Sequence, residues 1–564
     1  MKIFYCLFAL TLLFPENKAS SQSAKYLIQF TDKSGSPFSV GNPSQFLSSK
    51  SIERRSRQNI SFDETDLPVN PAYLDSLRLA GNVNLLNISK WLNQVCITTD
   101  DPSALRRIHS FLFVSDTRPL QRPVGSLSGG SNKSEKETEI TNTPALTENF
   151  NGVHDFYSYG NATAQIHIHE GEYLHEKGFH GEGMLVAVLD AGFYHYLSLP
   201  AFDSARKNNQ IADTHDFVTN DSNVDDDNPH GMYCLSIMAS NIPGQLIGSS
   251  PKAYYYLYRT EDAASETLIE EQNWVAAAER ADSIGVDVIS TSLGYSTFDN
   301  SAFDHTRADM DGNTTIISRA ADLAAKKGMI VVASAGNEGN KPWHFITAPA
   351  DADSILAVGA TDGQGMVGNF SSYGPSADGQ IKPDIASVGI NTALSTSTGA
   401  IGAGNGTSFA APNVAGLITC LWQAFPEFTN MEVINAVRES SNLLNAPDDR
   451  RGYGIPNFRI AFEDLKTKRL LKNATVLLGN SYINVLPNPF NSQFSVLINP
   501  GHSGTAAFSI HDATGRFLLK KNVSVQEGQA QLILFDNLPL IGKGLYFLSY
   551  TGKGEKQTIK ILRN

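Results

Sequence analysis

Cysteine is scarce in this chain, with four residues among 564. Cys6 lies in an apolar leader, and the other three, Cys96, Cys234 and Cys420, stand far apart in the sequence. So few thiols exclude a disulfide scaffold, and no CxxC or Cys/His spacing predicts a zinc site. The stability of the fold must therefore come from hydrophobic cores.

Long apolar runs and an excess of basic residues are also missing. The opening residues, MKIFYCLFALTLLFPENKASSQ, hold a lysine, an apolar run of about a dozen residues and then small polar residues, which predicts a secretory signal peptide over 1–22. A membrane-spanning helix needs ~20 apolar residues, so we expect no integral membrane protein. The net charge of −13 argues against a nucleic-acid partner.

Residues 23–118 follow a pattern of mixed strands and helices. Their order, β-α-α-β-β-α-β, predicts a ferredoxin-like α+β unit with one extra helix. PSQFLSSKSIERRSRQ predicts an amphipathic helix entered through proline, Asp101 predicts a helix N-cap, and FLFV predicts the last strand. Residues 119–150 have almost no apolar content, which predicts an exposed linker.

Residues 151–465 change to a different pattern. Apolar runs such as MLVAVLD, VDVISTSLG, MIVVASAGN and SILAVGA alternate with helical stretches. Strands that are apolar throughout and separated by helices predict an α/β domain with a parallel sheet covered on both faces. After a bridge at 466–478, residues 479–564 alternate between polar and apolar, with turn residues at short intervals, which predicts a small β-sandwich.

Three polar residues stand where strands end or helices begin. Asp190 follows the run LVAVL, His230 precedes Gly231 and a helix, and Ser408 opens the helix in GNGTSFAAPNVAG. Taken singly, each has an ordinary structural explanation: a turn cap, a helix cap, and the packing of small residues. We expect Pro412 to lie in the first turn, where no intrahelical donor is lost.

Together the three residues supply what acyl transfer needs. A serine hydroxyl becomes nucleophilic when an imidazole takes its proton, and a carboxylate orients that imidazole and stabilises the imidazolium. Asn337 follows another strand and could donate to the developing oxyanion. The alternative for Asn337 is a turn residue, because Asn and Gly are common in turns.

A phosphate site is the rival explanation of the glycine-rich segment GAIGAGNGTS before the helix. The lysine that a nucleotide loop requires is absent, and no acidic residue follows at the spacing of a dinucleotide site. The sequence therefore favours the nucleophile.

The segments VLDAG, HGMYCLSIMA, STSLG, ASAGNEG and GTSFAAPNVAG, in this order, resemble the signature segments of the subtilisin-like serine proteases. The resemblance implies that Asp190 orients His230, His230 is the general base, Ser408 attacks the carbonyl and Asn337 supplies the oxyanion hole. It also implies two substrate-binding segments: Ser292, Leu293 and Gly294 along the substrate backbone, and Ser334, Ala335 and Gly336 as one wall of the pocket for the residue before the cut.

Three positions depart from the family pattern. Ala191 stands where a hydroxyl residue usually supports the aspartate, Met232 replaces a threonine, and Ser387-Val388-Gly389 replaces Ala-Pro-Gly. None of these changes removes a catalytic group, so we expect activity. Some family members carry a buried free cysteine where this chain has Cys234, and we expect this residue to be a small core residue.

The flanking regions resemble known accessories of the family. By element order, residues 23–118 resemble an inhibitory propeptide, with 119–150 as the maturation region. The β-sandwich, with VLPNPF, DATGR and GLYFL, resembles the C-terminal sorting domains of the type IX secretion pathway of Gram-negative bacteria. That resemblance implies passage through the outer membrane to a secreted or cell-surface location. A carbohydrate- or protein-binding sandwich is the alternative.

Metal ligands are left open by the sequence. Subtilases often carry structural calcium, and acidic clusters occur at 225–228 (DDDN) and 308–313 (ADMDGN), but the full spaced pattern of a calcium loop is absent. Catalysis is expected to need no cofactor.

The favoured hypothesis for the whole chain is a secreted serine endopeptidase made as a zymogen. Its expected partners are peptide substrates, its own propeptide and the secretion machinery. The alternative hypothesis is an inactive subtilase that acts in surface binding or adhesion. The cleavage preference does not follow from the sequence, because it depends on loops.

Overall fold

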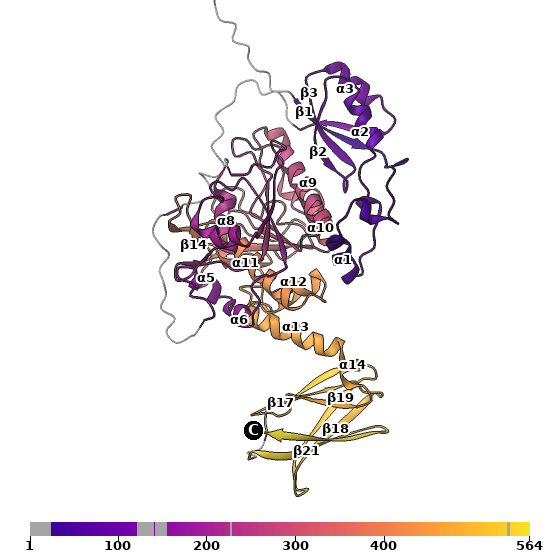
Figure 1. The fold of residues 1–564 in the computed structure, drawn as a ribbon, viewed down its shortest axis with the longest axis vertical. Coiled ribbons are helices and arrows are strands. Elements are labelled where there is room, and N and C mark those ends of the chain that lie inside the picture. Colours follow the sequence, from indigo (N-terminus) through magenta and orange to yellow (C-terminus); the bar gives the residue numbers. More distant parts are fainter. Residues whose placement is uncertain (1–23, 121–139, 142–154, 226–227, 539–541) are drawn as a thin grey trace, which may run out of the picture.

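The computed structural model describes residues 24–120, 140–141, 155–225, 228–538 and 542–564. The expected signal peptide and most of the expected linker lie outside these residues. Three folded parts follow one another: an N-terminal α+β unit, a large α/β domain, and a C-terminal β-sandwich (Figure 1).

The N-terminal unit has the predicted element order. It contains β1 (Ala24–Phe30), α1 (Ser49–Arg57), α2 (Pro71–Arg78), β2 (Asn84–Ser89), β3 (Gln94–Thr99), α3 (Pro102–His109) and β4 (Val114–Pro119). The antiparallel sheet has the order β2-β3-β1-β4, which is the ferredoxin-like arrangement. Asp101 caps α3 as expected, because its side chain accepts a hydrogen bond from Ser103 N.

Two element boundaries in this unit differ from the prediction. The first helix begins at Ser49, where the Ser48 side chain caps it, and Pro43 opens a separate 3-10 turn, η1 (Pro43–Gln45). In FLFV, residues 111–113 lie before β4, which begins at Val114, and Phe113 stacks on Tyr73 with ring centroids 4.2 Å apart. Both predictions were wrong because a tertiary contact or a local cap outweighed the apolar pattern.

A seven-stranded parallel sheet forms the centre of the large domain, as predicted. Its order is β13-β12-β11-β10-β5-β9-β6. The strands are β5 (Leu185–Asp190), β6 (Ile211–Asp216), β9 (Tyr254–Arg259), β10 (Val288–Thr291), β11 (Ile330–Ser334), β12 (Leu356–Thr361) and β13 (Ile385–Val388). Their residues alternate between two cores: Val186 and Val188 of β5 face one core, and Leu185, Ala187 and Leu189 face the other.

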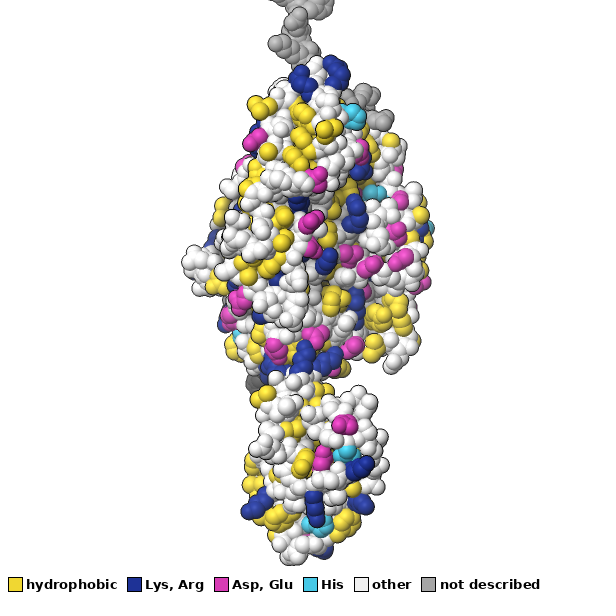
Figure 2. Space-filling view, turned by 90° about the vertical axis from the view of Figure 1, so that its right-hand side faces the viewer, with side chains coloured by type: hydrophobic (Ala, Val, Ile, Leu, Met, Phe, Trp, Pro, Cys, Tyr) yellow, Lys and Arg dark blue, Asp and Glu magenta, His cyan; other side chains and the backbone are white. Residues whose placement is uncertain are grey.

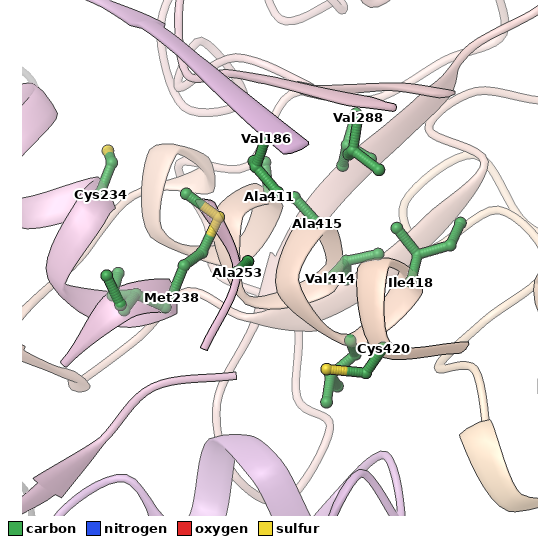
Figure 3. Close-up of a cluster of buried hydrophobic side chains, with 14 of the residues drawn as sticks. Val186, Cys234, Met238, Ala253, Val288, Ala411, Val414, Ala415, Ile418 and Cys420 are labelled. Atoms are coloured by element: carbon green, nitrogen blue, oxygen red, sulfur yellow. The ribbon is translucent and has the colours of Figure 1, made fainter. Parts of the chain in front are cut away.

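Helices cover both faces of this sheet. One face carries α8 (His230–Ala239), α11 (Thr407–Ala424) and α12 (Asn430–Glu439), and the other carries α9 (Ile269–Ile284) and α10 (Ile316–Lys326). The α11 helix is buried on every side, with Ala411 and Val414 close to Val186 and Val288 of the sheet (Figure 3). Small residues on α11 allow this close approach.

Shorter elements complete the large domain. They are α5 (Thr163–His167), α6 (Glu172–Glu176), α7 (Asp203–Lys207), β7 (Asn241–Ile242), β8 (Leu246–Ile247), β14 (Thr392–Ser395), β15 (Ile401–Gly404), and the 3-10 turns η3 (Pro200–Phe202), η4 (Ser301–Phe303) and η5 (Arg307–Asp309). A further 3-10 turn, η2 (Glu64–Asp66), belongs to the N-terminal unit.

The C-terminal part is a sandwich of two antiparallel sheets, as predicted. One sheet has the order β16-β17-β20, from β16 (Ile483–Leu486), β17 (Phe494–Ile498) and β20 (Gln531–Phe535). The other has the order β19-β18-β21-β22, from β18 (Gly504–Asp512), β19 (Phe517–Val525), β21 (Gly544–Gly552) and β22 (Glu555–Arg563). Aromatic residues from both sheets, such as Phe494 and Phe508, fill the core between them.

A helix leads from the large domain to the sandwich. It is α13 (Phe458–Lys472), followed by α14 (Ala474–Leu478), so the bridge predicted at 466–478 is helical. Charged side chains of both signs lie at this narrow junction (Figure 2), where Arg469 pairs with Glu427 and Lys472 with Glu432. Within the described residues, no helix combines the length and apolar character needed to cross a bilayer.

The N-terminal unit packs on the large domain through buried charges. Arg54 and Arg55 of α1 both donate to the Asp282 carboxylate near the end of α9, at 2.6 and 2.8 Å. Burial raises the pKa of Asp282, but Lys90, Arg54 and Arg55 outweigh it and hold the pKa below its ordinary value. One carboxylate thus joins several cations of the N-terminal unit to the domain (Figure 1 shows α1 beside α9 and α10).

We expect Asp282→Ala to destabilise the chain strongly, because it leaves the buried Arg54 without its ion-pair partner and the buried Arg55 with Asp66 alone. Removing one partner of a buried pair costs about 3–5 kcal/mol. Urea unfolding of the full chain, in a Ser408→Ala background that prevents self-cleavage, measures the change. Asp75→Ala is the matched control, because Asp75 pairs with Arg78 on the surface. Equal effects of the two substitutions would contradict a buried ionic anchor.

Candidate active site

The candidate residues meet at the carboxyl edge of three neighbouring strands. Asp190 ends β5, Ser292 follows β10 by one residue, and Asn337 follows β11. Two helices begin at the same edge, with His230 as the first residue of α8 and Ser408 as the second residue of α11. The carboxyl edge of a parallel sheet is where such groups collect.

Asp190 and His230 form a buried hydrogen bond. His230 Nδ1 and Asp190 Oδ1 are 2.7 Å apart, and Asp190 has no exposed surface. The helix can start this close to the strand because residue 231 is glycine: a β-carbon there would lie 2.6 Å from Gly192 O and 2.7 Å from Asp190 Cβ. Gly231 is therefore required for the contact.

The environment of His230 favours its protonated form. Burial lowers the pKa of His230, but the Asp190 carboxylate outweighs this effect, so the pKa lies well above its ordinary value. His230 Nε2 is buried and has no hydrogen-bond partner among the residues that the structure describes. In its neutral form, the imidazole donates Nδ1–H to the carboxylate and keeps Nε2 available to accept a proton, and the raised pKa favours the imidazolium that then forms.

Ser408 is held by its backbone. Pro412 lies in the second turn of α11 and not in the first, so its missing N–H leaves the Ser408 carbonyl without the helical donor. Two side chains replace that donor: Ser292 Oγ, at 2.9 Å, and Cys234 Sγ, at 3.3 Å. Ser408 Oγ itself donates to Ser292 O at 3.4 Å, a long bond that rotation of the side chain can exchange for another.

Asn337 is oriented by the residue before Ser408. Thr407 donates to Asn337 Oδ1 from its backbone N, at 2.9 Å, and from its hydroxyl, at 3.0 Å. The Thr407 hydroxyl also accepts a bond from Gly336 N at 3.2 Å. Because both bonds end on Oδ1, Nδ2 is the end of the amide left to donate elsewhere.

Three residues of this region, Thr407, Gly231 and Thr347, were not predicted to have a role in the site. The first two lie inside the motifs GTS and HG, so their position could have identified them. Thr347 has no such signal, because it reaches the site through a loop that contacts both segments predicted to bind substrate.

Each departure from the family pattern has a structural counterpart. Asp190 Oδ2 has no hydrogen-bond partner among the described residues, in agreement with the missing hydroxyl at Ala191. Met232 is buried in the core, and the Ser387 hydroxyl lies 2.7 Å from His169 Nε2. Cys234 is also a fully buried core residue, and burial raises the pKa of its thiol.

The acidic clusters named from the sequence are described only in part, and possible structural calcium there stays a prediction. Asp311 accepts bonds from Asn313 N, Thr314 N and the Thr314 hydroxyl, so its oxygens are used in a turn. At 225–228, two residues lie outside the described part. Two other groups, in the described part, bring possible ligand atoms within 4.8 Å of one another: Asp190, His230, Cys234; and Glu261, Glu266, Glu270. The second group was missed because its spacing matches no motif.

Comparison with family models finds three matches along the chain. Residues 181–454 match the subtilase family, and residues 25–138 match a peptidase S8 propeptide domain of Bacteroidota. Residues 484–564 match a secretion system C-terminal sorting domain. The three matches follow the order of the three folded parts.

Curated relatives are similar over the large domain. Subtilisin NAT of Bacillus subtilis subsp. natto and subtilisin E of Bacillus subtilis (strain 168) are each 28% identical over 275 residues, which cover 48% of this chain and 64% of theirs. The chain therefore spans less than two thirds of the length of these relatives. Subtilisin Savinase of Lederbergia lenta is 27% identical over 288 residues, which cover 51% of this chain and 93% of that protein.

The pKa of His230 should depend on Asp190. In a Ser408→Ala chain we expect His230 to titrate above pH 6.5, and Asp190→Asn to lower this pKa, because the burial remains when the charge is removed. Nuclear magnetic resonance of the imidazole nitrogens measures both values. His169 is the internal control: burial lowers its pKa to about 4, with no carboxylate partner. A His230 titration that Asp190→Asn leaves unchanged would contradict the pairing.

Proposed function

Since this chain carries a subtilase-family domain, we propose that it is a secreted serine endopeptidase, made as a zymogen, that hydrolyses peptide bonds through an acyl-enzyme intermediate. The observation that carries the proposal is the buried hydrogen bond between Asp190 and His230, at the sheet edge where Ser408 and Asn337 also lie. These are the groups that acyl transfer requires.

In the proposed reaction, the Ser408 side chain turns from Ser292 O toward His230 Nε2. The hydroxyl proton passes to Nε2 as Oγ attacks the substrate carbonyl, and Asp190 stabilises the imidazolium. Asn337 Nδ2 donates to the oxyanion. His230 then gives the proton to the leaving amine, and water repeats the sequence to release the acid and restore Ser408.

The N-terminal unit acts as the intramolecular inhibitor in this proposal. Support comes from the propeptide match over 25–138 and from the buried charges that hold α1 on α9. The chain would then become active when this unit is cut away. The other partners are protein or peptide substrates and, through the sandwich, the secretion machinery.

The sorting-domain match over 484–564 supports export by the type IX route. The destination is the cell surface or the medium of a bacterium with an outer membrane. This assignment favours the sorting role of the sandwich over the alternative of a carbohydrate-binding module.

Catalysis in this scheme needs no cofactor, because the base, the nucleophile and the oxyanion donor are all side chains. Structural calcium stays a prediction from the sequence and takes no part in the proposed reaction. An inactive subtilase that serves only in binding is the weaker hypothesis, because all four catalytic residue types are present.

A fluorophosphonate probe should label the chain at Ser408 and nowhere else. We expect the wild type to be labelled and to lose its N-terminal unit, and Ser408→Ala to do neither, because only an activated serine reacts with the probe. Intact-mass spectrometry reports both events in one sample. Ser371→Ala, at another buried serine of the domain, should behave as wild type. An unlabelled wild type that keeps its N-terminal unit would sink the protease proposal.

Asn337→Asp should lower kcat about 10²–10³-fold or more, the range found when one oxyanion donor is removed from a subtilisin. The aspartate keeps an acceptor for Thr407 but replaces the donor with a negative charge, so KM should change little. Steady-state hydrolysis of a peptide measures both constants. Asn405→Asp is the matched control, because the Asn405 side chain accepts a bond from Asn391 N beside the same helix. A change in KM with kcat unaltered would contradict the proposed role of Asn337 as the oxyanion donor.

A further inference from the structure

Thr347 lies between the two proposed substrate-binding segments. Its backbone N donates to Ala335 O at 3.3 Å. The next residue, Ala348, exchanges two backbone bonds with Tyr295, at 2.8 and 3.1 Å. The loop at 347–348 is therefore fastened to both the segment 292–295 and the segment 334–336.

The Thr347 side chain fills the space that two glycines leave open. A β-carbon added at Gly294 would lie 2.2 Å from Thr347 Oγ1, and one added at Gly336 would lie 2.8 Å from the same atom. Both glycine positions thus face this hydroxyl. A side chain that enters between the two glycines would therefore meet Thr347.

The hydroxyl of Thr347 is also unpaired. Thr347 is 3% exposed, and its Oγ1 has no hydrogen-bond partner among the described residues. The neighbouring Ser372 hydroxyl accepts a bond from Glu338 N at 3.0 Å and makes no hydrogen bond to Thr347 Oγ1. A buried hydroxyl without a partner is unfavourable, so a ligand that pairs with it is favoured.

We infer that the site takes peptides with a short side chain before the cleaved bond, with serine preferred over alanine and both preferred over aromatic residues. The inference rests on the proposed function, which puts that side chain between the segments 292–294 and 334–336. Thr347 sets the length limit through its bulk, and it sets the preference for serine through its unpaired hydroxyl.

Two physical effects determine how much kcat/KM should differ between the peptides. A long side chain must displace Thr347 from a loop that is bonded on both sides, and packed sites resist such a shift. A serine hydroxyl can exchange a hydrogen bond with Thr347 Oγ1, which an alanine cannot. We expect the wild-type kcat/KM to be about 10-fold or more higher for alanine than for phenylalanine, and a few-fold higher for serine than for alanine.

The test uses internally quenched peptides that differ only in the residue before the cleaved bond: serine, alanine, valine or phenylalanine. The enzyme is the matured wild-type chain, and mass spectrometry identifies the bond cut in each peptide. Three variants separate the effect of the size of the Thr347 side chain from the effect of its hydroxyl: Thr347→Gly, Thr347→Ser and Thr347→Val.

Thr347→Gly should raise the phenylalanine-to-alanine ratio of kcat/KM about 10-fold or more. Thr347→Ser should raise that ratio less and keep the preference for serine, so it serves if the glycine variant does not fold. Thr347→Val keeps the bulk and should bring the serine-to-alanine ratio close to one. Thr419→Val is the matched control, because Thr419 is a buried threonine whose hydroxyl bonds within α11; both ratios should stay at their wild-type values.

The outcomes distinguish this inference from the proposed function. A chain that is labelled by the fluorophosphonate and cuts phenylalanine and alanine peptides equally well overturns the inference, while the proposed endopeptidase function still stands. Unchanged ratios in Thr347→Gly and Thr347→Ser overturn it as well. A chain that is neither labelled nor cuts any peptide overturns both. If the Thr347 variants change the phenylalanine-to-alanine and serine-to-alanine ratios of kcat/KM as described, both the inference and the proposed function are supported.

Discussion

A carboxylate with no exposed surface is the constraint on which the site depends. An ionised Asp190 is unfavourable in this position unless donors meet it, and His230 Nδ1 and the backbone N of Ala191 both do so. The contact requires the first turn of α8 to touch the end of β5, which only glycine at 231 allows. The α/β fold makes this contact between α8 and β5 possible, because its strands end and its helices begin at the same edge of the sheet.

The backbone of the predicted nucleophile, Ser408, is also held by groups that replace a lost hydrogen-bond donor. Pro412 removes the donor that would have paired with the Ser408 carbonyl, and the side chains of Ser292 and Cys234 take its place. Ser292 thereby joins the end of β10 to the start of α11, and Cys234 joins α8 to it. A defect in one helix is thus what ties the three elements of the site together.

Much of this molecule follows from local sequence patterns. The parallel sheet, the sandwich, and the positions of Asp190, His230 and Ser408 at the ends of elements are visible in apolar runs and short motifs. The boundaries of α1 and β4 were missed because a serine cap and an aromatic stack decide them. Pro412 was placed one turn too early. Thr347 and Asp282 were not foreseen at all, because their partners are distant in sequence.

The ionic anchor at Asp282 also bears on how the N-terminal unit leaves. In the intact chain the carboxylate of Asp282 and the guanidinium groups of Arg54 and Arg55 are all withdrawn from water. Their mutual attraction is offset by the hydration that each of them gave up. Once the chain between the N-terminal unit and the large domain is cut, separation of the two parts lets water hydrate the charged groups on both of them again. These buried ion pairs specify one docking geometry, yet they contribute little net affinity of their own to hold a severed piece in place.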